Sequence, residues 1–102
     1  MAISNTTINT APQAIYTSQG NNAIVTAYFC NTSANPVTFS VHAVPNGSTA
    51  DITNIIYSNV NITTNDTYVW DTEKLILSDG DSLWAVASDD DVVVVTVCDV
   101  EV

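Results

Sequence analysis

The sequence predicts an all-β fold: a single antiparallel β-sandwich, Ig-like or jelly-roll-like, of about seven or eight strands. β-branched Val, Ile and Thr are abundant, whereas the helix-favouring Lys, Arg, Gln and Glu are nearly absent. Short runs in which apolar and polar residues alternate recur along the chain. Turn sequences separate these runs roughly every 8–12 residues, a spacing typical of sandwiches.

Residues 23–44 carry the clearest strand pattern. From Val37 to Val44 the residues alternate, with His42 on the polar parity, so one face of this strand should be dry and the other wet. Residues 23–30 are apolar on both parities, which is typical of a strand covered on both faces. Asn35 and Pro36 predict a turn between the two runs. We therefore expect a hairpin of one well-covered and one half-exposed strand.

The remaining elements flank this pair. Residues 1–12 are small and polar and predict an N-terminal arm, either disordered or docked on a neighbour, ahead of a sandwich domain at residues 13–102. Residues 50–54 fit either a loop or one helical turn. The Ser-Asp-Gly-Asp turn at residues 78–81 predicts a second hairpin. Further strands are expected at residues 14–18, 55–62, 67–71, 75–77, 83–87 and 92–102.

The composition bounds the function. A chain of 102 residues, 46% of them hydrophobic, fits one domain with a substantial core. One Lys (Lys74), no Arg and 11 acidic residues give a formal net charge of −10. Such a charge disfavours nucleic acids and anionic membranes as partners. Solubility is the simplest role for the charge, and a basic partner or a bound cation are the alternatives. The N-terminus lacks the pattern of a signal peptide, and we expect synthesis in the cytosol.

Reactive side chains are few. Nucleophilic catalysis requires a base beside the nucleophile, and the single His, His42, falls on the wet side of its strand. We expect no enzyme and no catalytic residue. Cys30 and Cys98 lie in apolar runs without zinc spacing, which predicts two buried free thiols. A disulfide between them is the alternative and requires Cα atoms within about 7 Å.

Two weaker patterns suggest ligands. Asp79 and Asp81 in one turn and residues 89–91 in another would bind Ca²⁺ if the loops were close, because hard cations take several oxygen ligands. Solvated turns are the simpler interpretation, and we expect no metal and no cofactor. Exposed aromatic rings can stack on sugars, but rings in so small a domain more often fill the core. The aromatic residues concerned are Tyr57, Tyr68, Trp70 and Trp84.

Several segments resemble small virion structural proteins of tailed phages, cyanophages in particular. These segments are TAYFCNTS at residues 26–33, PVTFSVHAVP at 36–45, NDTY at 65–68, SDGDSL at 78–83 and AVAS at 85–88. The resemblance extends from about Ile15 onward. It implies a compact sandwich without catalysis that is built into the particle as a capsid decoration (cement) or tail-associated subunit. It carries over no functional residues.

The leading hypothesis is a non-enzymatic virion structural protein, assembled in the host cytoplasm as a homo-oligomeric capsid decoration subunit. A tail, neck or baseplate-associated subunit and a carbohydrate-binding adhesin module are the alternatives. Expected partners are further copies of the chain and other virion proteins, such as the major capsid or tail proteins. Lys, which usually guards exposed strand edges, is nearly absent, so edges should be covered in an oligomer. The candidate interface residues are Ile3, Ile8, Tyr57, Trp70, Val100 and Val102.

Overall fold

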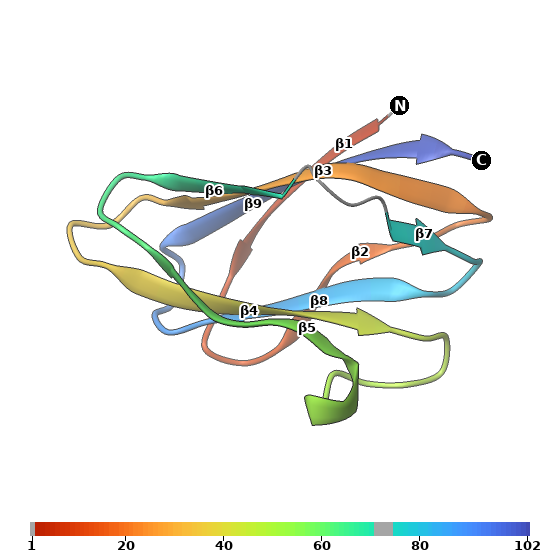
Figure 1. Cartoon of the computed structure of the whole chain (residues 1–102), viewed down its shortest axis with the longest axis horizontal. Coiled ribbons are helices and arrows are strands. Elements are labelled where there is room, and N and C mark those ends of the chain that lie inside the picture. Colours follow the sequence, from red (N-terminus) through yellow and green to blue (C-terminus); the bar gives the residue numbers. More distant parts are fainter. Residues whose placement is uncertain (1, 71–74) are drawn as a thin grey trace.

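The computed structural model describes residues 2–70 and 75–102 and consists of two antiparallel sheets packed face to face (Figure 1). This confirms the all-β sandwich, with nine strands in the described residues instead of seven or eight. Asp71, the last residue of one predicted strand, and Lys74 lie outside the described residues. The elements are β1 (Ala2–Ile8), β2 (Gln13–Thr17), β3 (Asn22–Asn31), β4 (Val37–Val44), the 3₁₀ turn η1 (Ile52–Asn54), β5 (Ile55–Ile62), β6 (Thr67–Trp70), β7 (Leu75–Leu77), β8 (Ser82–Ala87) and β9 (Val93–Glu101).

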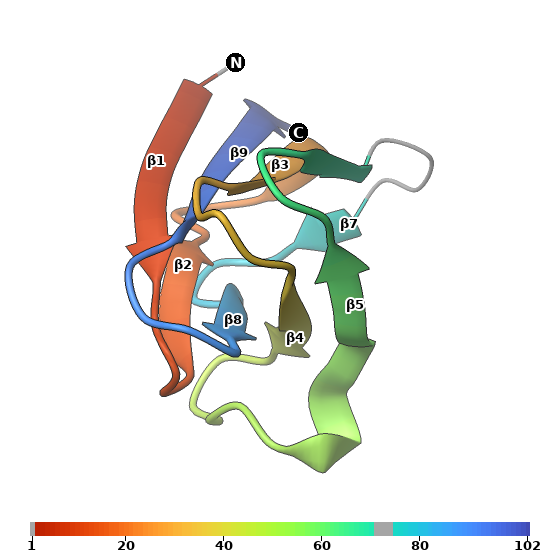
Figure 2. The same ribbon diagram turned by 90° about the vertical axis from the view of Figure 1, so that its left-hand side faces the viewer.

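The two sheets have different strand orders. One sheet has five strands in the order β1-β9-β3-β6, with β7 also paired to β3. The other has four strands in the order β2-β8-β4-β5. Viewed along the long axis, the two layers are separate and both termini lie beside the five-stranded sheet (Figure 2).

The N-terminal segment adds the extra strand. It was expected to form an arm outside the sandwich, but β1 instead pairs with β9 from Ala2↔Asp99 to Ile8↔Val93. The side chain of Ile8 is fully buried in the core. Small polar residues such as Ser and Thr hide this strand in the sequence, because an edge strand with one wet face tolerates them as well as an arm does.

The predicted hairpin of residues 23–44 is wrong. Its two strands exist as β3 and β4, but β3 belongs to the five-stranded sheet and β4 to the four-stranded sheet. The connection crosses between layers and is held by Asn31, whose side chain is fully buried. The Asn31 amide donates to the carbonyls of Asn35 at 2.8 Å and Ile62 at 3.1 Å. Alternation defines the faces of a strand but not its neighbour, so pattern and turn together could not distinguish a hairpin from a crossing.

The second predicted hairpin is also a crossing. Residues 78–81 do form a turn, but they connect β7 in the five-stranded sheet to β8 in the four-stranded sheet. Gly80 has a φ of 87°, a conformation that side chains rarely adopt. Its N–H donates to the Ser18 carbonyl at 2.9 Å, and Ser18 N–H donates to the Asp81 carbonyl at 2.8 Å. These bonds fasten the crossing to the end of β2.

The core lies between the sheets and contains a line of aromatic rings. Phe29 of β3 stacks on Phe39 of β4, and the ring of Tyr68 lies 5.5 Å from that of Phe39. Tyr57 makes edge contacts with Tyr68 at 5.9 Å and with Trp70 at 5.6 Å. Aromatic pairs of this geometry stabilise the contact between layers beyond their buried area. Aliphatic residues fill the rest of the core, including Ile8, Ile24, Val41, Leu83, Val93, Val95 and Val97.

Candidate interaction surface

The outer face of the five-stranded sheet, which points away from the core, is built from uncharged residues. Side chains along a strand alternate between the two faces of the sheet. The residues that alternate with the buried ones therefore form the outer face. In one row across the sheet Ile3 lies beside Cys98, which lies beside Thr26. In the next row Thr96 lies beside Tyr28, which lies beside Val69. We define the outer face as Ile3, Asn5, Thr7, Ala23, Thr26, Tyr28, Cys30, Thr67, Val69, Ile76, Val94, Thr96, Cys98 and Val100.

Four large apolar side chains of this face are exposed. The exposed fraction is 67% for Ile3, 68% for Ile76, 43% for Val69 and 41% for Tyr28. They lie on β1, β7, β6 and β3, four of the five strands of the sheet. Single exposed apolar residues are ordinary, so these four side chains make the face a candidate for interaction.

The acidic residues that the structure describes lie elsewhere. Most are in the turns that connect strands, at the ends of the sandwich. Asp99 is on β9 but faces inward, and Glu101 ends that strand. Although the formal net charge of the chain is −10, the outer-face positions that the structure describes carry no charged residue. Two copies can meet on such a surface without bringing carboxylates together.

Strand β1 provides an open edge beside this face. It pairs with β9 along its whole length without a register shift, and it contains neither a charged residue nor Pro. The edge strands of the other sheet are interrupted: β2 has a bulge between Ala14 and Tyr16, and β5 is irregular, with Asn59 at a φ of 52°. Bulges protect an edge from pairing with another chain, and β1 has none.

The predicted interface residues separate into two groups. Ile3 and Val100 are on the outer face, and Val102, 63% exposed, follows directly after β9. These three lie at the same end of the sheet, because the start of β1 pairs with the end of β9. The other three point inward.

Ile8 and Trp70 are buried, and Tyr57 packs its ring against Trp70, so they are core residues and not contact residues. Sequence reasoning missed Tyr28, Val69 and Ile76. Each lies on the strand parity opposite to a buried neighbour, which is the signal that could have found them.

The two cysteines also lie on the outer face. Both are free thiols, as predicted, but they are half-buried and not fully buried. Cys98 is opposite Thr26, whereas Cys30 is opposite Val94. Cys30 is four positions beyond Thr26 along β3, a distance of about 13 Å. This is too far for the alternative of a disulfide within one chain.

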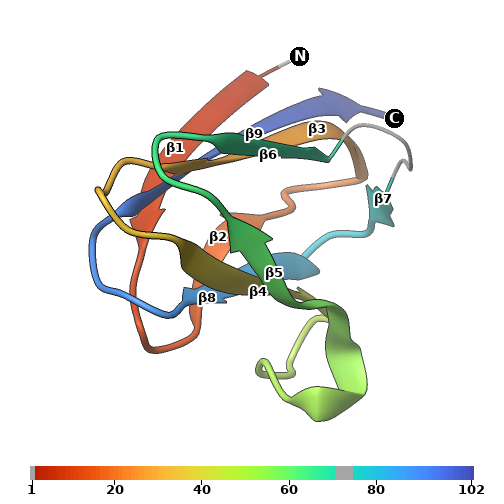
Figure 3. The same cartoon turned by 60° about the vertical axis from the view of Figure 1, so that its left-hand side comes forward.

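His42 is buried, contrary to the expectation of a wet position. The loop that contains η1 extends from the end of β4 (Figure 3), and two of its residues contact the His42 ring. Its Nδ1 lies 2.9 Å from both the Asp51 carbonyl and Asn54 Oδ1. Both partners are acceptors, so Nδ1 carries the hydrogen. This His therefore ties the loop to the sheet.

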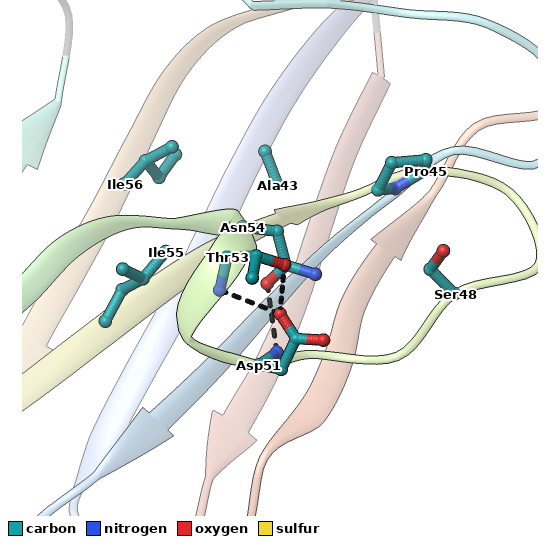
Figure 4. A pocket seen from close by; sticks show the side chains of 8 residues that line it. All are labelled: Ala43, Pro45, Ser48, Asp51, Thr53, Asn54, Ile55 and Ile56. Carbon is teal, nitrogen blue, oxygen red and sulfur yellow. Dashed lines mark hydrogen bonds between the residues drawn. The ribbon is translucent and has the colours of Figure 1, made fainter.

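The same loop borders a pocket of about 370 Å³ (Figure 4). Its one carboxylate, Asp51, accepts a hydrogen bond from Thr53 N at 2.8 Å and a second from the Thr53 hydroxyl. These bonds lower the pKa of Asp51. The carboxylate acts as the N-cap of η1. The lining holds no second carboxylate that could pair with it in acid–base chemistry. The lining is Ala43, Pro45, Ser48, Asp51, Thr53, Asn54, Ile55 and Ile56.

The acidic turns do not meet. Residues 78–81 precede β8 and residues 89–91 follow it, so the two turns lie at opposite ends of one strand. Asp79 accepts a hydrogen bond from Gly20 N–H at 2.8 Å, and Asp90 accepts one from Thr10 N–H at 2.9 Å. No group of three or more metal-ligating side chains is present in the described residues. Both carboxylates thus accept hydrogen bonds from backbone N–H groups of neighbouring turns.

The aromatic residues considered for sugar stacking mostly face inward. Tyr57, Tyr68 and Trp70 form the aromatic line of the core. Trp84 on β8 is half-buried, and its Nε1 donates to Ser82 Oγ at 2.8 Å. Of these four residues, Trp84 is the one whose ring lies outside the aromatic line of the core, and Tyr28 on the outer face is a further exposed ring.

Comparisons with protein-family models, curated proteins and solved structures find no match to this chain. In the described part of the chain, no helix has the length and apolar character needed to cross a bilayer.

Proposed function

We propose that this chain is a non-enzymatic structural subunit of a phage virion, a capsid decoration or cement protein that assembles as a homo-oligomer. The observation that carries the proposal is the uncharged outer face of the five-stranded sheet, with Ile3, Tyr28, Val69 and Ile76 exposed on it. The second support is the resemblance of five segments to small virion proteins of tailed phages. From this resemblance we infer that the chain assembles on a phage particle.

The partner on this face is a second copy of the chain. Every copy carries the same large negative charge, so self-association requires a contact region without carboxylates, and the outer face meets that requirement. In a two-fold interface the same patch serves both copies, which an uncharged face permits without like-charge contact. The regular, unprotected edge of β1 is continuous with this face and offers backbone groups to a neighbouring strand.

The proposal predicts where the chain is found. Particles purified by density gradient are digested, and copies of this chain are counted against the major capsid protein by mass spectrometry with labelled peptides. A fixed ratio, with antibody labelling on heads, is the expected result. Labelling confined to tails would move the subunit to the tail, neck or baseplate. Absence from washed particles, or a trace that varies between preparations, would contradict a structural role.

The carbohydrate-binding adhesin is the alternative of another class, and Trp84 is the residue on which it now depends. A glycan array probed with the wild-type chain and with Trp84→Ala separates the two functions. A structural subunit gives no glycan signal that depends on Trp84, whereas an adhesin loses its signal in the variant.

A further inference from the structure

A second pocket, of about 280 Å³, lies at the end of the sandwich where β1 begins and β9 finishes. Ser4 and Asp99 come from the five-stranded sheet, and Tyr16 comes from β2 of the other sheet, so the pocket opens between the layers. Both chain termini are drawn near this end of the molecule (Figure 1). The complete lining is Ser4, Tyr16, Thr17, Gln19, Asn22 and Asp99.

Asp99 is the charged group of this pocket. Its exposed fraction is 8%, so the side chain is more than nine-tenths buried. Oδ2 accepts a hydrogen bond from the Tyr16 hydroxyl at 2.8 Å. Oδ1 is buried and has no hydrogen-bond partner among the described residues. A buried carboxylate oxygen without a donor is unfavourable, and a ligand in the pocket that Asp99 lines would relieve this once a small side-chain movement exposed Oδ1 to its donor.

The other polar groups of the lining mainly offer acceptors. The amide nitrogen of Asn22 donates to Ser18 Oγ at 2.9 Å and to the Gln19 carbonyl at 3.0 Å, which leaves its Oδ1 as an acceptor. The hydroxyl oxygens of Ser4 and Thr17 can also accept. None of the lining residues is cationic. The pocket therefore combines one negative charge with several acceptors and no positive charge, although the Gln19 amide and the hydroxyls of its lining can also donate.

We propose that this pocket binds a primary ammonium group, carried either by a lysine side chain of a partner protein or by a small free amine. An ammonium group has three N–H donors and one positive charge, which match Asp99 Oδ1 and the neighbouring acceptors. Ca²⁺ fits less well, because it takes six to eight oxygen ligands, usually with several carboxylates, and this pocket has one. The inference is independent of the assembly proposed above.

The test is a titration of the wild-type protein followed by NMR of the Asp99 carboxyl carbon and the Tyr16 ring. Methylammonium should give a saturating shift at both positions. Tetramethylammonium has the same charge but no N–H donor, and it should give none. Asp99→Asn keeps an acceptor for Tyr16 but removes the charge, and it should weaken methylammonium binding at least about tenfold. Glu101→Gln removes the same charge from an exposed position two residues along β9 and should bind as the wild type does.

A third ligand distinguishes the two sources. This ligand is Nα-acetyl-lysine amide, and its affinity is compared with that of methylammonium. Tighter binding assigns the site to a lysine of a partner protein, whereas equal or weaker binding assigns it to free amines. The proposal is overturned if methylammonium gives no saturating shift, or if tetramethylammonium acts equally. These comparisons use the wild-type chain, so they stand even if Asp99→Asn fails to fold. They do not depend on the oligomeric state.

Discussion

The rings of Phe29 and Phe39 stack across the two sheets, with centroids 4.3 Å apart and an interplanar angle of 12°. Both side chains are almost completely buried. Phe29 precedes the crossing from β3 to β4 and Phe39 follows it, so their contact joins the sheets close to a point where the chain changes layer.

Loss of this stack should appear as coupling between the two positions. Phe29→Leu and Phe39→Leu should each lower the free energy of unfolding by about 1–2 kcal/mol, measured by urea denaturation. The double variant should cost less than the sum, by about 0.5–1.5 kcal/mol, because the ring contact is lost once. Tyr28→Leu, on the outer face of the same strand, is the control and should change stability by about 0.5 kcal/mol or less. Strict additivity of the two Phe variants would contradict the stack.

Gly80 should tolerate a side chain less well than Gly47. Both have a positive φ, 87° and 85°, so Ala at either position brings a backbone penalty of about 1–2 kcal/mol. A Cβ on Gly80 would also lie 2.5 Å from Asn46 Cγ, whereas nothing lies within 4 Å at Gly47. Gly80→Ala should therefore destabilise slightly more than Gly47→Ala in urea denaturation, by the small cost of turning the exposed Asn46 side chain away, and adding Asn46→Ala should remove the excess. Equal costs for the two glycines would show that the clash is absent.

The Tyr16–Asp99 hydrogen bond predicts a loss of stability in alkali. Burial, helped by the hydrogen bond and the charge of Asp99, raises the pKa of Tyr16 from 10.0 to about 12. The folded state holds this proton more tightly than the unfolded state does. The resulting stabilisation is complete below pH 10 and is lost as the pH rises from 10 through 12.

The free energy of unfolding, measured in urea at several pH values, should fall across this window in the wild type. It should fall less steeply in Tyr16→Phe, which has no phenolic proton to lose. Tyr28→Phe on the outer face serves as the matched control and should follow the wild type. Parallel curves for Tyr16→Phe and the wild type would refute the assignment.

The strands could be predicted from the sequence, but their neighbours could not. Alternation located β4 and β5, because burial on one face has a period of two residues, and a continuous apolar run located β9. The same alternation fits a hairpin and a crossing equally, so the partners of β3 and β7 were wrong. The strand β1 was missed because its small polar residues show no clear alternation of apolar and polar side chains. Its last residue, Ile8, is nevertheless fully buried in the core.

The candidate site was predictable only in part. Ile3 and Val100 were expected at an interface and do lie on the outer face, whereas Ile8 and Trp70 are buried. Hydrophobicity alone cannot separate the two groups, since an apolar side chain suits a core and an interface equally. The cover over His42 depends on how the η1 loop folds back, and no local pattern encodes that contact.

The claim on which the proposed assembly depends is that copies of the chain meet on the outer face of the five-stranded sheet. Tyr28 and Ile56 are nearly equally exposed, at 41% and 42%, but Ile56 lies on β5 of the other sheet. Tyr28→Asp and Ile56→Asp add the same charge, so they are matched variants for sedimentation velocity over a range of concentrations.

The account predicts that the wild type and Ile56→Asp sediment as the same oligomer and that Tyr28→Asp sediments as a monomer of 10.9 kDa. Circular dichroism of each variant confirms that the sandwich is intact. A wild type that stays monomeric at every concentration, or a Tyr28→Asp variant that assembles as well as Ile56→Asp, would contradict the account.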